Sequence, residues 1–68
     1  MIIHLREEYI KLGQALKAAN LVETGVDAKI VIQNGEVSVN GEVDLRRGKK
    51  LYAGDIVEYN GETIEIMK

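Results

Sequence analysis

Residues 24–45 read TGVDAKIVIQNGEVSVNGEVDL, and the spacing of their apolar residues changes at Gly35. Before Gly35, three apolar residues recur at the helical spacings of three and four positions: Ala28, Val31 and Ile32. After Gly35, valines alternate with polar residues, which is the period of a strand with one buried face. This stretch therefore predicts a helix that is followed by a strand.

The predicted helix covers about residues 25–34. Thr24 stands three positions before Asp27, as in a capping box, so its side-chain oxygen can accept from the backbone N–H groups of the first turn. Gly35 suits the left-handed residue that closes a helix. Ile30 lies near the polar side of this helix, and two roles stay open for it: packing on a neighbouring element, or part of a contact surface.

An Asn-Gly pair at residues 40–41 predicts a hairpin. A plain two-residue loop would set Val39 opposite Glu42 and Val37 opposite Asp44, which places acids on the apolar face. A loop with an odd number of residues would avoid this. We therefore expect a bulged hairpin with its glycine in the left-handed region.

The chain before this stretch predicts a first helix from Tyr9 to a stop near Asn20. One apolar stripe runs along it: Tyr9, Leu12, Leu16 and Ala19. The short apolar start at residues 2–5 could form an edge strand.

The chain after this stretch predicts a second hairpin. A strand through residues 56–59 is followed by Asn60-Gly61, and a two-residue loop there pairs Val57 with Ile64. The element order indicates an α+β domain, in which two helices pack on one face of a small antiparallel sheet of short hairpins.

The chain has 68 residues, enough for a single domain spanning residues 1–68. Apolar residues make up 46% of it and cysteine is absent, so packing alone must hold the fold, as expected in a reducing compartment. No apolar run has the length of a signal-peptide core or of a membrane span. We expect a cytoplasmic protein.

Groups that could carry out catalysis are few. His4 is the only histidine, and we expect it to be partly buried at an edge. Ser38 stands between apolar strand residues without a base, and the acids lack the spacing of a metal site. Neither a phosphate-binding loop nor a dinucleotide fingerprint is present. The sequence therefore predicts no enzyme activity, no cofactor and no metal.

Positive charge is concentrated in one segment although the net charge is −2. Four basic residues surround Gly48 without an intervening acid: Arg46, Arg47, Lys49 and Lys50. Such a local patch can bind phosphates, or it can be a solvated loop.

Polar residues on the predicted helices could extend this patch. Lys11 and Gln14 project from the first helix, and Lys29 and Gln33 share the outer side of the second. Lysine can contact phosphate and glutamine can read a base edge or a ribose hydroxyl. Each is also an ordinary outer-face residue of a helix. The tyrosines Tyr52 and Tyr59 could stack on bases, but we expect them in the core, since Trp and Phe are absent.

Four segments together resemble the S-four (S4) RNA-binding domain. Residues 11–16, KLGQAL, resemble its first-helix signature, and residues 24–29, TGVDAK, its second-helix start. Residues 34–41, NGEVSVNG, resemble its hairpin, and residues 51–57, LYAGDIV, its closing strand. The match covers most of the chain in the same order and is closest to the very small bacterial members, the YaaA-like and YbcJ-like proteins.

The resemblance implies the alpha-L motif, in which two helices and a hairpin face the RNA. It implies structured RNA, ribosomal or transfer RNA, as partner, and by analogy a role in ribosome assembly. The positions it assigns to RNA binding are Lys11, Gln14, Lys29, Gln33, Asn34, Arg46, Arg47, Lys49 and Lys50. Two positions depart from the family pattern, because Gln33 replaces a usual basic residue and Ile30 a usual polar one.

A different reading is a protein-interaction module, in which Val26, Ile30 and the acidic surface contact a partner and the basic segment is incidental. An enzyme is the least supported reading, because no nucleophile or acid–base pair is evident.

Overall fold

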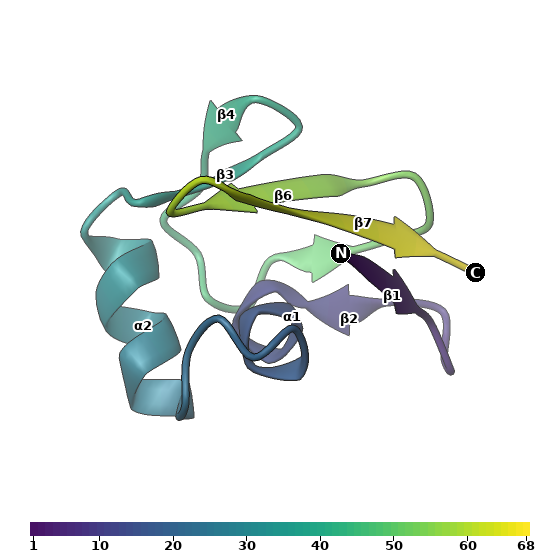
Figure 1. Ribbon diagram of the computed structural model, residues 1–68, viewed down its shortest axis with the longest axis horizontal. Helices are drawn as coiled ribbons and strands as arrows, with labels where there is room; N and C mark the ends of the chain where they lie inside the picture. The colour runs from purple at the N-terminus through teal and green to yellow at the C-terminus, as the bar shows by residue number, and fades with distance from the viewer.

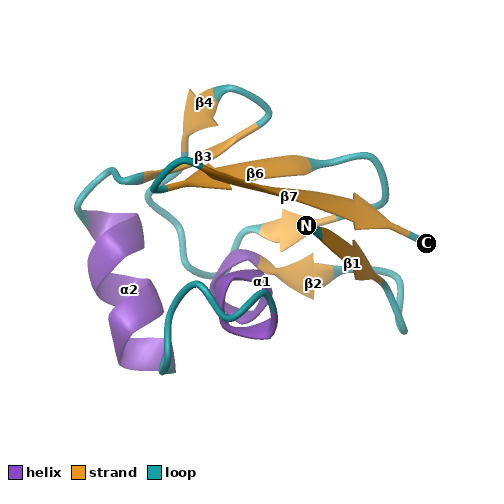
Figure 2. Ribbon diagram, in the orientation of Figure 1, coloured by secondary structure: helices purple, strands orange, loops and turns teal.

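The computed structural model describes residues 1–68, which form two helices and seven strands (Figures 1 and 2). The elements in chain order are β1 (Ile2–His4), β2 (Ile10–Lys11), α1 (Leu12–Ala18), α2 (Gly25–Gln33), β3 (Val37–Val39), β4 (Glu42–Val43), β5 (Lys50–Leu51), β6 (Ile56–Tyr59) and β7 (Glu62–Met67).

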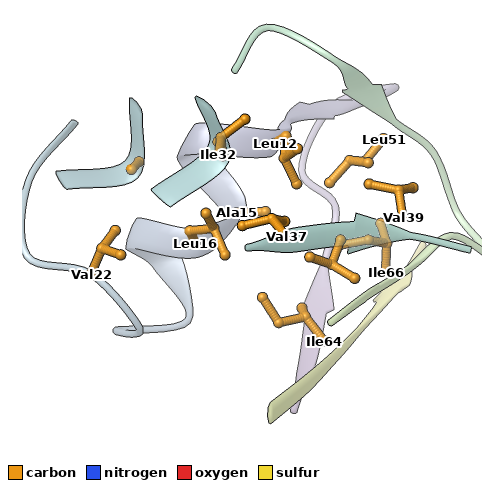
Figure 3. Close-up of a cluster of buried hydrophobic side chains, with 12 residues drawn as sticks. Leu12, Ala15, Leu16, Val22, Ile32, Val37, Val39, Leu51, Ile64 and Ile66 are labelled. Carbon is orange, nitrogen blue, oxygen red and sulfur yellow. The ribbon is translucent and has the colours of Figure 1, made fainter. Parts of the chain in front are cut away.

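The strands form one five-stranded sheet, in the order β1-β7-β6-β3-β4, and a separate two-stranded ribbon of β2 and β5. Both helices and β2 lie on the same side of the large sheet (Figure 1). The core fills the space between these two layers (Figure 3). It consists of Leu12, Ala15, Leu16, Val22, Ala28, Ile32, Val37, Val39, Leu51, Val57, Ile64 and Ile66.

Helix α2 has the predicted bounds and caps. The Thr24 Oγ1 accepts a hydrogen bond of 3.1 Å from the backbone N of Asp27, and Gly35 follows the helix with φ of 78°. Ala28 and Ile32 are fully buried, whereas Ile30 is 51% exposed. Ile30 therefore contributes to the surface and not to the core.

Helix α1 begins later than predicted. Residues 10–11 form β2, which pairs with β5, and the helix starts only at Leu12. The apolar spacing suggested a start at Tyr9, but Tyr9 precedes β2 outside any helix or strand, and only the residues from Leu12 onward are helical. The predicted end is right, because Asn20 has φ of 63° and stops the helix.

The first hairpin is not bulged, so that prediction is wrong. Asn40 and Gly41 have φ of 52° and 86° and form a plain two-residue turn, which pairs Val39 with Glu42. The helices do not cover β4, so an acid in this strand does not face the core. Both β4 residues are exposed at the sheet edge, so the acid opposite Val39 stays in water. The Asp44 carboxylate is satisfied by Arg46, as described below.

The second hairpin matches the prediction. Asn60 and Gly61 form the two-residue turn, and Val57 pairs with Ile64, both buried. The fold class predicted from sequence is confirmed, with two helices on a sheet of short strands.

Strand β1 makes the sheet mixed, since it pairs parallel with β7 while the other pairs are antiparallel. It forms the edge strand that the short apolar start suggested. The backbone N of Leu5 donates to the Met67 carbonyl at 2.7 Å. His4 is exposed on this strand, contrary to the partial burial we expected. Neither helix is long and apolar enough to cross a membrane.

Candidate nucleic-acid interface

The basic segment of residues 46–50 is fixed against the start of α1. The backbone N of Leu12 donates to the Lys49 carbonyl at 2.8 Å, and that of Gly13 donates to the Arg47 carbonyl at 3.0 Å. These N–H groups have no partner within the helix, because they belong to its first turn. The segment is therefore part of the folded structure and not a freely solvated loop.

A glycine at position 13 allows this close approach. A β-carbon on Gly13 would lie 2.8 Å from the Arg47 Cγ, which is closer than side chains tolerate. The aliphatic stem of Arg47 thus lies directly on the helix backbone, and its guanidinium is directed from there.

A polar hollow of about 310 Å³ opens beside this contact, where α1, the start of α2 and the basic segment meet. We call it the basic groove. It has no apolar or acidic lining residue, and it is formed by Lys11, Gly13, Gln14, Lys17, Gly25, Arg47 and Gly48. Three cations therefore converge here: Lys11 and Lys17 from the two ends of α1, and Arg47 from the basic segment.

Gln14 has a structural role in the groove. Its Oε1 accepts a hydrogen bond of 3.2 Å from the backbone N of Lys11, which caps the start of α1. Because the amide oxygen is engaged, the amide NH₂ is the half that remains for a ligand.

The predicted residues of α2 extend from one end of the groove. Lys29 and Gln33 follow Gly25 at intervals of four residues, so they continue the side of α2 that begins at the groove. Both are exposed. Asn34 lies at the helix end, where its Nδ2 donates to the Glu36 Oε2 at 3.4 Å.

Arg46 is the one basic residue of the chain whose side chain forms an ion pair. Its Nη2 lies 2.9 Å from the Asp44 Oδ2, and its Nε donates to the Asp44 Oδ1 at 3.1 Å. The hydrogen bond from the Arg46 side chain lowers the pKa of Asp44. The carboxylate also compensates the charge of this guanidinium, so Arg46 offers an anionic ligand less than Arg47 does.

Two predicted lysines remain, of which Lys50 lies in the β2–β5 ribbon and Lys49 directly precedes it. Lys50 is directly opposite Lys11 in the antiparallel pairing, and its Nζ lies 4.8 Å from the centre of the Tyr9 ring. Lys49 is half-buried and contributes its backbone to the contact with α1. It lines a different hollow, under the β3–β4 hairpin.

The fold thus brings Lys11, Gln14 and Arg47 into one groove and sets Lys50 next to it. It places Lys29 and Gln33 along α2, and it directs Arg46 and Asn34 to their own acidic partners. The sequence reading missed Lys17 and Tyr9. Lys17 is one turn after Gln14, and this spacing was a usable signal. Tyr9 had been assigned to the helix stripe.

Tyrosine 52 is not a core residue, so that expectation is wrong; it is 43% exposed. Tyr59 is half-buried against the core, as predicted.

A hydrogen bond between an asparagine and an aspartate joins the chain segments before and after β5. The Asn40 Nδ2 donates to the Asp55 Oδ1 at 3.0 Å, and the Asp55 Oδ2 accepts from the backbone N of Tyr52 at 2.8 Å. The Asn40 Oδ1 in turn accepts from the backbone N of Ile56 at 2.9 Å. The two motif residues Asn40 and Asp55 therefore stabilise the fold.

No cluster of three or more His, Cys, Asp or Glu side chains is arranged to hold a metal ion. The basic groove and the β2–β5 ribbon present cations, the amide of Gln14 and an aromatic ring.

Comparison with known proteins identifies relatives of this arrangement. Residues 3–67 match the family described as the S4 domain. A probable ribosome maturation protein of Bacillus subtilis, RlbA, is 49% identical over 59 residues, which cover 87% of this chain and 83% of that protein. A putative RNA-binding protein of Escherichia coli, YbcJ, is 32% identical over 62 residues, covering 91% of this chain and 89% of YbcJ.

Two solved structures have a similar fold. The solution structure of Escherichia coli YbcJ, described as revealing an alpha-L motif involved in RNA binding, superposes with a TM-score of 0.75 and 31% identity, over 98% of this chain and 86% of that one. The ribosomal protein S4e of Thermoplasma acidophilum shares the fold, with a TM-score of 0.71 and 22% identity over 85% of this chain and 31% of that one.

Proposed function

Because the chain belongs to the S4 domain family, we propose that it binds structured RNA through the basic groove and the adjoining β2–β5 ribbon. The relatives point the same way, since YbcJ is described as RNA-binding and RlbA as a probable ribosome maturation protein. Ribosomal RNA, or a precursor of the ribosome, is therefore the partner we propose first, with transfer RNA as the other structured RNA to test.

The observation that carries this proposal is the convergence of Lys11, Lys17 and Arg47 in a groove without an acidic or apolar lining. A chain with a net charge of −2 attracts RNA only if its cations are gathered on one face. The groove gathers them, and the backbone hydrogen bonds from Leu12 and Gly13 hold the basic segment in place before any ligand arrives.

The residues have different proposed roles. We propose that backbone phosphates are held by Lys11, Lys29, Arg46, Arg47, Lys49 and Lys50, and we add Lys17 because it lines the basic groove. Arg47 contributes more than Arg46, because Asp44 pairs with the latter. Gln14, Gln33 and Asn34 donate amide hydrogens to ribose hydroxyls or base edges.

We propose that residues 1–68 act by binding alone, as one cytoplasmic RNA-binding domain without catalytic activity. In this reading the protein fixes a conformation of its RNA during assembly of the ribosome.

The test is crosslinking and sequencing of RNA bound to the tagged protein in cells, compared with the Lys11→Glu/Arg47→Glu variant. We expect enrichment of one region of ribosomal RNA that the variant loses. Equal recovery of the same RNA by wild type and variant would exclude the groove as the binding site.

A matched control is the Arg6→Glu/Lys68→Glu variant. It changes the net charge by the same amount but places the change beside β1 and β7. Retained enrichment in this control shows that position, and not net charge, decides binding. If it loses the RNA as fully as the groove variant, only general electrostatics is acting.

One observation supports a second candidate, a protein contact. Val26 and Ile30, one turn apart on α2, are 65% and 51% exposed. The Ile30→Asp variant should retain RNA binding whether or not α2 also contacts a protein. Loss of a bound protein in that variant would favour the protein-interaction reading.

A further inference from the structure

Two tyrosines and two lysines share the outer face of the β2–β5 ribbon. Ile10 pairs with Leu51 and Lys11 with Lys50. Tyr9 and Tyr52 directly flank the Ile10–Leu51 end of this ribbon, and their rings are in contact. Because side chains alternate along a strand, Lys11 and Lys50 project away from buried Leu51, and the Lys50 ammonium meets the Tyr9 ring on that side. We call these four residues, Tyr9, Lys11, Lys50 and Tyr52, the tyrosine–lysine ribbon.

The two rings contact each other but are not covered. Their centroids lie 6.0 Å apart at an interplanar angle of 54°, and the residues are 36% and 43% exposed for Tyr9 and Tyr52. Lys50 lies over the Tyr9 ring. Of the two rings, Tyr52 is therefore the one more open to a ligand.

The backbone of Tyr52 is held in place. Its N–H donates to the Asp55 Oδ2 at 2.8 Å, and its carbonyl accepts from the backbone N of Asp55 at 3.0 Å. The Asp55 carboxylate is fixed by Asn40 through its other oxygen. A ring on such a backbone loses little freedom when it binds a ligand.

The charges beside the rings are cationic and uncompensated. Neither Lys11 nor Lys50 has a carboxylate partner, since the ion pair of this protein joins Arg46 to Asp44. Like charges directly opposite each other destabilise a strand pair. The repulsion between Lys11 and Lys50 therefore lowers the stability of the free protein. An anion bound between the two ammonium groups would remove this repulsion.

We propose that the tyrosine–lysine ribbon binds an unpaired nucleotide of the RNA, with the base stacked on the Tyr52 ring and the phosphate between Lys11 and Lys50. This inference rests on the proposed function and refines it. Lys11 also lines the basic groove, so the nucleotide directly continues the backbone that the groove holds.

The base must be unpaired because a base inside a duplex already has both faces covered by its neighbours. Aromatic side chains beside cations are the usual way in which proteins bind single-stranded segments without reading their sequence. The RNA that fits this surface is therefore a stem that ends in, or is interrupted by, single-stranded nucleotides.

The experiment measures the affinity of the purified protein for three RNA hairpins. The first has a blunt stem, the second carries a short adenosine extension, and the third carries an extension of the same number of abasic nucleotides. The adenosine and abasic extensions have equal numbers of phosphates, so their difference reports the base alone.

We expect the adenosine extension to bind at least about fivefold more tightly than the abasic one, the effect of one stacked base. The Tyr52→Leu variant should lose this difference, and the Tyr52→Phe variant, which keeps the ring, should retain it. Thermal unfolding shows whether the Tyr52→Leu variant is folded. If it is unfolded, the Tyr52→Phe variant still shows whether the ring without its hydroxyl supports the base preference.

The failures are distinguishable. Equal affinity for all three hairpins, or a base preference that Tyr52→Leu retains while folded, overturns the tyrosine–lysine ribbon as a stacking site and leaves the proposed function intact. Absence of binding to every hairpin and to extracted ribosomal RNA overturns both.

Discussion

The aliphatic stem of Arg47 lies on the backbone of Gly13, so closely that a β-carbon at residue 13 would stand 2.8 Å from the Arg47 Cγ. The contact joins the basic segment to α1 and sets where the guanidinium points. Since the contact atom is in the middle of the arginine side chain, the arginine cannot avoid a methyl group by moving its end alone.

The Gly13→Ala variant should therefore bind RNA more weakly, by roughly three- to tenfold, the equivalent of about 1 kcal/mol. Alanine favours the helix by up to ~1 kcal/mol over glycine, which offsets part of the steric cost to stability. The measurement is a double-mutant cycle with Arg47→Ala. In the Arg47→Ala background, Gly13→Ala should leave affinity unchanged; a further loss there would show that Gly13 acts in another way.

Charge neutralisation at Lys50 should separate binding from folding. In Lys50→Gln, the repulsion from Lys11 and the attraction to the Tyr9 ring both disappear, so unfolding free energy should change by less than about 1 kcal/mol. RNA affinity should fall, and the slope of log affinity against log salt should decrease by about one. Titrations at several salt concentrations check this, and an unaltered slope would remove Lys50 from the interface.

The Asp44 carboxylate should reduce the contribution of Arg46 to RNA binding. The Asp44→Asn variant removes the compensating charge, so RNA affinity should rise while stability falls. The affinity gain should vanish in an Asp44→Asn/Arg46→Gln double variant. Binding that is equal in Asp44→Asn and wild type would mean that Arg46 does not contact RNA.

The same pair predicts a pH dependence of stability. The hydrogen bond from Arg46 lowers the pKa of Asp44 below its ordinary value of 3.8. A carboxyl with a lowered pKa in the folded state stabilises fully above its ordinary pKa, and this contribution is lost as pH falls through the lowered pKa. The stability difference between wild type and Asp44→Asn should be constant above that range and disappear in stronger acid, as denaturant unfolding can show.

Asp55 should matter more for stability than its surface position suggests. Asp55→Ala leaves the Tyr52 N–H and the Asn40 amide without their acceptor, at a cost of about 1–3 kcal/mol. Urea unfolding measures the loss. A change well below 1 kcal/mol would mean that water replaces the carboxylate.

Local signals made part of the fold predictable. The cap at Thr24, the glycine at 35 and the alternation after it determine α2 and β3, because each acts within a few residues. The turn at Asn60-Gly61 is of the same kind, and its register follows from burial on both strands.

Long-range pairing explains what the sequence did not reveal. Strands β2 and β5 have two residues each and are paired across about half of the chain, so neither has a period of its own. Without this pairing, Tyr9 reads as part of a helix and Tyr52 as core. The register of the first hairpin depended on whether β4 is covered, which is a property of the assembled layers and not of the hairpin.

The candidate site was likewise predictable only in part, because its residues are brought together by contacts between distant segments. The residue types and the basic segment were visible in the sequence, but the convergence of Lys11, Lys17 and Arg47 depends on the hydrogen bonds that place the segment on α1. The pairing of Arg46 with Asp44 is local, two residues apart, and could have been inferred from the spacing.

Strand β7 lies between β1 and β6, and it supplies two fully buried core residues, Ile64 and Ile66. Strand β1 thus has no neighbour to pair with until β7 has been made. The helices and the β3–β4 and β3–β6 pairs can form earlier, because none of them needs β7. The docking of β1 on β7 is therefore the pairing with the greatest sequence separation in the sheet, and strand pairings of this kind form slowly.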